Sequence, residues 1–230
     1  MIYIKYILVA FTLISLVACN STKEPKKVEE LKEEIKETNT TVNITTTLPT
    51  STLGALSLKQ VHVKQALDLY LNDLATFNTD SIVDKTYPKL FQVIDLDLFR
   101  QYISSMMNST DIEMTSYESD ITELSKVTTF SNDTEFAQAK YTSTVNMQFL
   151  NDALYNNEEK INFLYDALIH KYGKENIQID VEARTLRIKK SEKLLIIKEK
   201  DSEWKFLGDN TKYRQLYPSF LPYEILEILN

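Results

Sequence analysis

Apolar residues recur with helical spacing at the start of the chain's central region. Between about 58 and 77 they fall three or four positions apart, which puts them on one face of an amphipathic helix. That face consists of Val63, Leu67, Tyr70, Leu71, Leu74 and Phe77. A second helical stretch is predicted over 81–92, where Pro88 limits its regularity. A third helix follows, with Asp95 or Asp97 as its N-cap. Its apolar face would consist of Leu98, Phe99, Tyr102, Ile103 and Met106.

The hydrophobic period changes to two after about residue 112. Residues 112–131 are rich in Thr, Ser and Tyr, and residues 135–149 alternate more regularly. One side of 135–149 carries Ala137, Ala139, Tyr141, Ser143, Val145 and Met147. The other side carries Phe136, Gln138, Lys140, Thr142, Thr144 and Asn146. Such alternation is typical of a half-buried antiparallel strand.

The last third of the chain combines one more helix with further strands. A helix is predicted over 158–172, with Gly173 as its C-terminal cap. Strands are predicted over 176–182, 184–190, 192–199 and 204–207, with a turn at 200–203 before the last of them. A short helix over 223–229 ends the chain. Helices followed by a meander of strands predict an α+β fold with helices on a curved antiparallel sheet, and the helix near 158–172 is an insertion between strands.

This order of elements resembles the cone-shaped ketosteroid isomerase-like superfamily, which includes the SnoaL-like and nuclear-transport-factor-like domains. The resemblance covers roughly 60–210 and depends on pattern, with a closing hairpin that ends in Glu203-Trp204-Lys205-Phe206-Leu207. Leu221-Pro222-Tyr223-Glu224 resembles tails of bacterial lipoproteins in that superfamily. The helix over 158–172 departs from the simplest version of the fold.

The resemblance implies a pocket between the sheet and the N-terminal helices. Enzymes of the superfamily place an Asp or His there as a base, with a Tyr or a second acid as the oxyanion donor. No acid of this chain aligns with such a position, so the pocket candidates are chosen by location only: Tyr70, Asp73, Asp84, Tyr87 and Tyr141. Tyr141 lies on the more apolar side of its strand, where an ordinary core tyrosine is the alternative interpretation.

No cofactor or metal site is predicted. His62 lies near a helix start and His170 in a last helical turn, where a cation suits the helix dipole. Neither histidine has ligand spacing around it, and one cysteine excludes thiolate clusters. The sequence contains no Gly-x-Ser-x-Gly, phosphate-loop or dinucleotide motif, and it has only three glycines.

The N-terminus has the features of a secretory signal peptide over residues 1–18. Lys5 precedes a short apolar run over 7–17, and Ala18 supplies a small residue before Cys19. The run is too short for a membrane span, which needs about 20 apolar residues. Leu16-Val17-Ala18-Cys19 resembles the lipobox of bacterial lipoproteins. The resemblance implies cleavage between Ala18 and Cys19, acylation of Cys19, and attachment to the cell envelope, with the outer membrane favoured because Asn20 is not the aspartate of inner-membrane retention signals.

A polar tether is predicted over 19–57, between the acylated cysteine and the domain at 58–230. Residues 24–37 have the pattern of a short solvated helix, and a coiled-coil partner site is the alternative. Residues 38–54 are Thr-rich and lack core periodicity, which is typical of a flexible stalk.

Charge limits the partners that the chain can have. Its net charge is −7, and clusters of Lys and Arg that could neutralise nucleic-acid phosphates are missing from the sequence. Acidity gives no attraction to anionic lipid, so membrane attachment depends on the acyl anchor.

Three functions remain open after these exclusions. The first is a non-enzymatic domain that binds a small apolar ligand or an envelope protein. The second is an isomerase- or hydrolase-like enzyme with a pocket carboxylate and a tyrosine. The third is a structural subunit of an envelope complex.

Overall fold

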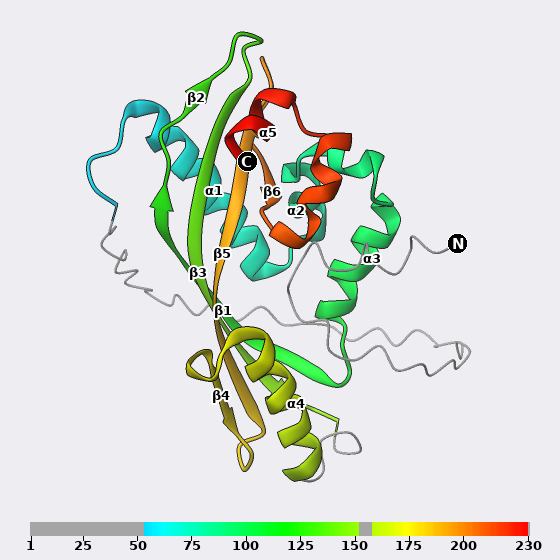
Figure 1. Ribbon diagram of the computed structural model, residues 1–230. Coiled ribbons are helices and arrows are strands. Elements are labelled where there is room, and N and C mark those ends of the chain that lie inside the picture. Colours follow the sequence, from blue (N-terminus) through cyan, green and yellow to red (C-terminus); the bar gives the residue numbers. More distant parts are fainter. Residues whose placement is uncertain (1–52, 152–157, 230) are drawn as a thin grey trace, which may run out of the picture.

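The computed structural model describes residues 53–151 and 158–229, which form an α+β fold (Figure 1). Five α-helices and three 3₁₀ segments accompany a six-stranded antiparallel sheet within these residues. The fold class predicted from the sequence is confirmed. The signal peptide, Cys19 and the predicted tether up to residue 52 lie outside the described residues.

The N-terminal helices begin and end at residues that the sequence marks clearly. Helix α1 (Leu58–Thr76) begins at Ser57, whose hydroxyl caps the Gln60 amide, and it ends at Phe77 in the left-handed conformation. Helix α2 spans Thr79–Lys85. Helix α3 (Leu96–Met107) is capped by Asp95, whose carboxylate accepts a hydrogen bond from the Leu98 amide at 2.9 Å. Asp95, and not Asp97, is therefore the cap.

The single helix predicted over 81–92 is wrong. Helix α2 stops at Lys85, Thr86 and Tyr87 are non-helical with ψ angles of 143° and 115°, and a separate 3₁₀ segment, η2, covers Pro88–Gln92. Proline disfavours the helical conformation of the residue before it, so the helix must end ahead of Tyr87. This break lets the Tyr87 amide donate to the Phe206 carbonyl at 2.9 Å, which ties the helical layer to the last strand.

The sheet is built around its longest strand, β3 (Glu135–Phe149). Strand β1 (Ile112–Leu124) pairs with one edge of β3, and β5 (Thr185–Lys198) pairs with the other. Three shorter strands complete the sheet: β2 (Thr128–Thr129), β4 (Ile177–Asp180) and β6 (Lys205–Gly208). Two register shifts in β1, at Met114/Ser116 and Ile121/Glu123, are bulges of the kind that bend a strand and curve a sheet.

One boundary predicted between strands is wrong. The predicted strands 184–190 and 192–199 are one continuous strand, β5, while the alternating region 112–131 contains the two strands β1 and β2. The polar pair Ser191-Glu192 suggests an interruption in the sequence. In the structure both residues stay in the ladder, since Ser191 lies opposite Thr142 and Glu192 lies opposite Tyr141 on β3.

Helix α4 (Glu158–Tyr172) lies between β3 and β4 in the chain, as the sequence predicted, and beside β4 at the lower end of the sheet in Figure 1. It ends at Gly173, whose φ of 88° is a conformation that favours glycine. The chain then continues through the 3₁₀ segment η3 (Lys174–Asn176). After β6 it closes with the 3₁₀ segment η4 (Thr211–Ser219) and helix α5 (Tyr223–Leu229).

The apolar core is divided into two clusters along the sheet. The first cluster joins one end of β3 and β5 to α1, α2, α3, η4 and α5, and Tyr70 of α1 stacks on Phe206 of β6 with ring centroids 4.4 Å apart. The second cluster joins the other end of β3 and β5 to α4. Leu194 to Ile197 are all buried, so both faces of β5 are covered beside the first cluster.

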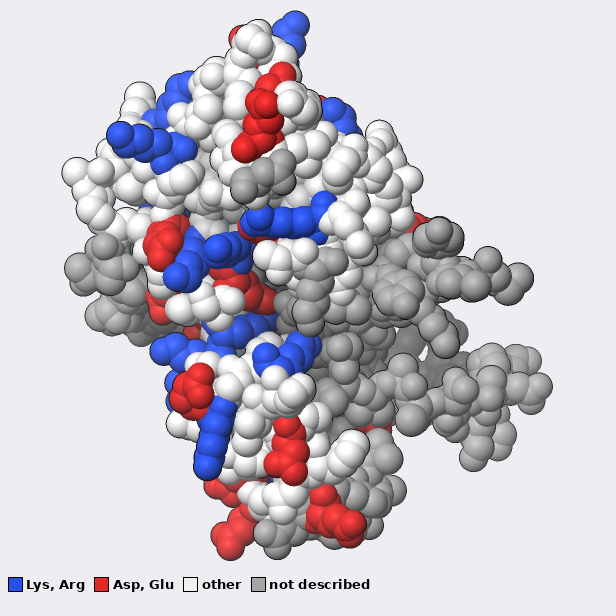
Figure 2. Space-filling view, in the orientation of Figure 1, with Lys and Arg blue, Asp and Glu red and all other residues white. Residues whose placement is uncertain are grey.

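The uncovered face of β5 beside the second cluster carries polar side chains. Arg187, Lys189, Ser191 and Lys193 are exposed there. Figure 2 shows basic and acidic side chains intermixed across the middle of the face in view. Because the charges are mixed, this surface has no resemblance to the concentrated basic stripe of a nucleic-acid-binding protein.

Candidate functional site

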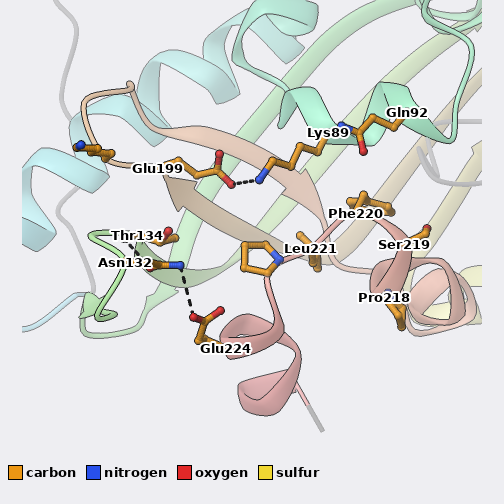
Figure 3. Close-up of a pocket in the computed structure, with 12 residues that line it drawn as sticks. Lys89, Gln92, Asn132, Thr134, Glu199, Pro218, Ser219, Phe220, Leu221 and Glu224 are labelled. Carbon is orange, nitrogen blue, oxygen red and sulfur yellow. Dashed lines mark hydrogen bonds and ion pairs between the residues drawn. The ribbon is translucent and has the colours of Figure 1, made fainter.

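A surface pocket of about 630 Å³ lies where four segments of the chain meet (Figure 3). Segment η2, the turn between β2 and β3, the end of β5, and the junction between η4 and α5 each contribute side chains. The lining residues are Lys89, Gln92, Asn132, Thr134, Glu199, Lys200, Pro218, Ser219, Phe220, Leu221, Pro222 and Glu224. A volume of this size is within the usual range for small-ligand sites.

Glu199 is held by two hydrogen bonds at the η2 side of the pocket. Its Oε1 accepts from Lys89 Nζ at 2.6 Å and from Tyr87 Oη at 2.7 Å. Burial acts to raise the pKa of Glu199, but the hydrogen bonds from Lys89 and Tyr87 outweigh it, and the pKa is lowered. Glu199 therefore stays ionised and is a weak proton acceptor. Burial and the adjacent Glu199 charge raise the pKa of Tyr87, so its proton stays in place.

The opposite side of the pocket is held by a link between a turn and a helix. Asn132 Nδ2 donates to Glu224 Oε1 at 3.4 Å, and the Thr134 amide donates to Asn132 Oδ1 at 3.1 Å. Figure 3 shows Lys89 and Glu199 directed toward each other on one side, and Asn132 and Glu224 on the other. Figure 3 shows Phe220 and Leu221 to one side of both pairs, near Ser219, and both residues are buried. The pocket lining thus combines apolar side chains with side chains of both charges.

The two aspartates among the sequence candidates do not line this pocket. Asp73 accepts a hydrogen bond from Ser81 Oγ at 2.6 Å and forms an ion pair with Lys85, which joins α1 to α2. The Asp84 carboxylate is exposed, 3.8 Å from Lys205. Asp73 has a structural role in this arrangement, and Asp84 lies at the surface.

Tyr70 and Tyr141, two other sequence candidates, come together in a buried group of polar side chains on the sheet. We call Tyr70, Tyr117, Tyr141, Ser143, Lys190 and Glu192 the central polar cluster; each is buried except Glu192, whose side chain is 19% exposed. Tyr141 Oη donates to Glu192 Oε2 at 2.8 Å, and Lys190 Nζ donates to Glu192 Oε1 at 3.1 Å. Tyr87, the third tyrosine among the sequence candidates, lies outside this cluster and contacts Glu199 at the surface pocket.

The strand register explains why these side chains meet. Tyr141 lies opposite Glu192, and Ser143 lies opposite Lys190, so all four point to one face of the sheet. On that face Ala139 and Leu194 belong to the first apolar cluster, while Val145 and Ile188 belong to the second. The central polar cluster therefore separates the two halves of the core.

Burial dominates the electrostatics of the central polar cluster. It raises the pKa of Tyr117 to about 12, with a smaller contribution from Glu192. It also raises the pKa of Tyr141 well above its ordinary value, and the Glu192 charge adds to that shift. Burial lowers the pKa of Lys190, while the attraction of Glu192 opposes this. The tyrosines stay protonated as hydrogen-bond donors.

Three hydroxyls of the central polar cluster are buried without a hydrogen bond. Within the described residues, no hydrogen-bond partner of acceptable geometry faces the hydroxyls of Tyr70, Tyr117 and Ser143. Tyr117 is close to Ser143 and Tyr141, and Tyr70 is close to Thr86, and each contact partly lowers the raised pKa of the tyrosine. Such groups cost about 1–3 kcal/mol each when nothing satisfies them.

Sequence reasoning missed Glu192, Lys190, Tyr117 and Glu199. One signal was present for Glu192 and Lys190, since both interrupt an otherwise apolar alternation in 184–197. Glu199 follows a run of buried residues and precedes the turn at Lys200, so its sequence position resembles any exposed turn residue. Tyr87, 112 residues away, is the partner that gives Glu199 its place in the pocket.

The described residues contain neither a candidate metal site nor a candidate membrane span. No group of three or more His, Cys, Asp or Glu side chains among them could hold a metal ion. Likewise, none of the described helices is long and apolar enough to cross a bilayer. His62 and His170 are both exposed on their helices.

Comparisons with known proteins give no match to this chain, whether with protein families, curated proteins or solved structures. The likeness to the ketosteroid isomerase-like superfamily therefore remains a prediction from the sequence.

Lys190→Met should destabilise the domain by about 3–5 kcal/mol, because it leaves the Glu192 carboxylate largely buried without its cation. Lys190→Met/Glu192→Met should recover much of this loss, since it removes both charges. Denaturant unfolding measures both values. Lys189→Met, on an exposed neighbour, is the control and should be nearly neutral. A single variant as stable as this control, or a double variant less stable than the single one, would contradict the ion pair.

Proposed function

We propose that this chain is a lipid-anchored bacterial envelope protein whose domain binds a small polar ligand and catalyses no reaction. Acylation of Cys19 would hold it on the membrane, and the tether up to residue 57 would hold the domain away from the bilayer. The ligand site would be the pocket between η2 and the η4–α5 junction.

This proposal depends on one observation: the Glu199 carboxylate already accepts hydrogen bonds from Lys89 and Tyr87. A general base needs a pKa near the working pH, and the pKa of Glu199 is shifted away from that range by Lys89 and Tyr87. The arrangement instead provides fixed charges and hydrogen-bonding groups beside the apolar side chains of Phe220 and Leu221. Fixed polar groups in a pocket that is partly lined by apolar side chains favour one orientation of a bound molecule.

The charges at the rim indicate the class of ligand. Lys200 is exposed at one side of the pocket, and Glu224 lies at another. A molecule with one cationic and one anionic group would complement both. The polar lining favours such a zwitterion over the small apolar ligand expected from the sequence.

A second candidate function is an enzyme that uses the central polar cluster. In its favour, a carboxylate and a tyrosine converge there, since Tyr141 Oη lies 2.8 Å from Glu192. Against it, the Tyr141 proton is already donated to Glu192, and Lys190 neutralises the same carboxylate. Both groups would have to leave their present partners before they could act on a substrate, so we favour binding.

Binding is tested by calorimetric titration of the domain with free amino acids and dipeptides. N-acetylated and amidated forms of the same probes lack one charge each and should bind less tightly. Glu224→Gln and Lys200→Gln should each weaken zwitterion binding about tenfold by removing one charged partner. Lys126→Gln, on an exposed lysine outside the pocket, should bind as the wild type does.

The result that contradicts the proposal is equally concrete. Absence of saturable binding by every zwitterionic probe would remove the pocket as such a site. If mass spectrometry detects chemical conversion of a bound probe, and Glu192→Gln abolishes that conversion, the domain is an enzyme and the proposal of a binding protein is wrong.

The anchor is tested separately, by fractionation of bacterial cells that express Cys19→Ser. Since Cys19 is the only cysteine of the chain, the change removes the acylation site without affecting a disulfide. We expect the wild type in the membrane fraction and the variant released from it or retained with an uncleaved signal. A mature Cys19→Ser protein that stays on the membrane would refute lipid anchoring.

A further inference from the structure

The face of the sheet opposite α4, which we call the open face, carries both signs of charge, and each sign keeps to its own strand. Directly opposite residues of antiparallel strands point to the same face, so the ladders decide which side chains share it. The exposed acids of β1 on the open face form an acidic row: Glu113, Glu118, Asp120 and Glu123. The exposed cations of β5 on the same face form a basic row: Arg187, Lys189 and Lys193.

Strand β3 separates the two rows with short polar side chains. Thr142, Thr144 and Asn146 are half-buried on the open face, while Val145 points to the other face and packs with α4. The two rows lie two strand spacings apart, about 10 Å. Among the described residues no ion pair joins one row to the other.

Separation of the charges by strand is unfavourable for a domain that meets only water. Glu118 and Asp120 lie two positions apart on β1, and Arg187 and Lys189 do so on β5, so each pair places like charges side by side. Like charges at such close positions repel each other, and surfaces that meet only solvent usually intersperse the two signs. The rows therefore indicate a partner surface that sets a basic row against the acidic one and an acidic row against the basic one.

A second copy of this chain presents such a surface. If two open faces meet about a two-fold axis that runs along β3, the rotation places β1 of each copy over β5 of the other. Glu118 and Lys189 both lie opposite Thr144 in the register, so Glu118 would face Lys189 of the partner subunit, and this pair would form twice. Glu123 would face Lys193 of the partner subunit in the same way. A two-fold axis across the strands would instead set acidic row against acidic row.

We propose that the open face of the sheet is a homodimer interface, in which the acidic row of each copy contacts the basic row of the other. Over β1, β3 and β5 the patch is about 14 Å wide and about 30 Å long, or roughly 400 Å² on each copy. This is about half the area of a standard stable interface, so the dimer is weak and depends on its charge pairs. Salt screens such pairs and should dissociate it.

The interface is separate from the other sites discussed above. It shares no residue with the surface pocket, so ligand binding and association can fail independently. Copies held on one membrane by the proposed Cys19 anchor would meet at a higher effective concentration. The experiments below use soluble protein and do not depend on that anchor.

The first test is analytical ultracentrifugation of the mature chain with Cys19 replaced by serine. In about 0.01 M salt the average mass should rise with protein concentration toward twice the monomer mass, and in about 1 M salt it should stay that of the monomer. A monomer in both salts at protein concentrations up to about 1 mM would overturn the proposal. Association that persists unchanged in high salt would overturn it as well.

Charge reversals test which rows meet. Glu118→Lys and Lys189→Glu should each weaken association in low salt at least about tenfold, because each sets like charges against each other twice in the dimer. The double variant Glu118→Lys/Lys189→Glu has the wild-type net charge and should recover the dimer. Asp166→Lys on α4 and Lys174→Glu on η3 make the same charge changes away from the open face and should associate as the wild type does. If Glu118→Lys strengthens association, the acidic rows face each other and the proposal is wrong.

Chemical cross-linking tests the axis. Thr144→Cys in the Cys19→Ser chain gives a single cysteine on β3, close to the proposed two-fold axis, so the two copies would bring their cysteines together. A short bismaleimide should link this variant into a dimer in low salt and not in high salt. Asp166→Cys in the same background, on exposed α4, should stay a monomer. Equal cross-linking of both variants would mean random collision and would contradict the arrangement.

Discussion

The ladder between β3 and β5 is the interaction on which the arrangement of this domain depends. It runs through fourteen residue pairs, from Gln148 opposite Thr185 to Glu135 opposite Lys198. Because side chains alternate between faces along both strands, this one register decides which residues enter either apolar cluster. It also places Tyr141 beside Glu192 and Ser143 beside Lys190. A shift of β5 by one residue would carry Glu192 and Lys190 to the other face, away from Tyr141 and Ser143.

The long ladder also explains why the domain has two groups of polar interactions of different character. Glu199 follows the last residue of this ladder, where the chain leaves the sheet. Its carboxylate accepts hydrogen bonds from Lys89 and Tyr87, at the edge of the surface pocket. Near the middle of the ladder, the helices α1 and α4 cover the same face of the sheet from opposite ends. The residues of the central polar cluster are buried because they lie between these two helices. Hydrogen bonds from Tyr141 and Lys190 to Glu192 stabilise them there. A charge that is bound in this way supports ligand orientation better than proton transfer.

How far the sequence predicted these features depends on the distance between the interacting residues. The buried face of α1 and the alternation of β3 follow from local periods, and the structure confirms both. Gly173 and Asp95 were also found, since caps depend on neighbours within one turn. The pocket and the central polar cluster depend on pairs such as Tyr141 with Glu192 and Tyr87 with Glu199, which lie 51 and 112 residues apart. A single sequence has no local signal for such pairs.

The central claim is that the pocket carboxylate is a fixed, paired charge and not a proton acceptor. Carbon-13 NMR of the side-chain carboxyl of Glu199, followed as a function of pH, measures this directly. The structure predicts a midpoint below the ordinary value of about 4.5, because Lys89 and Tyr87 stabilise the ionised form. A midpoint near neutrality would contradict this assignment, because it would mean that Glu199 is poised to exchange a proton at physiological pH.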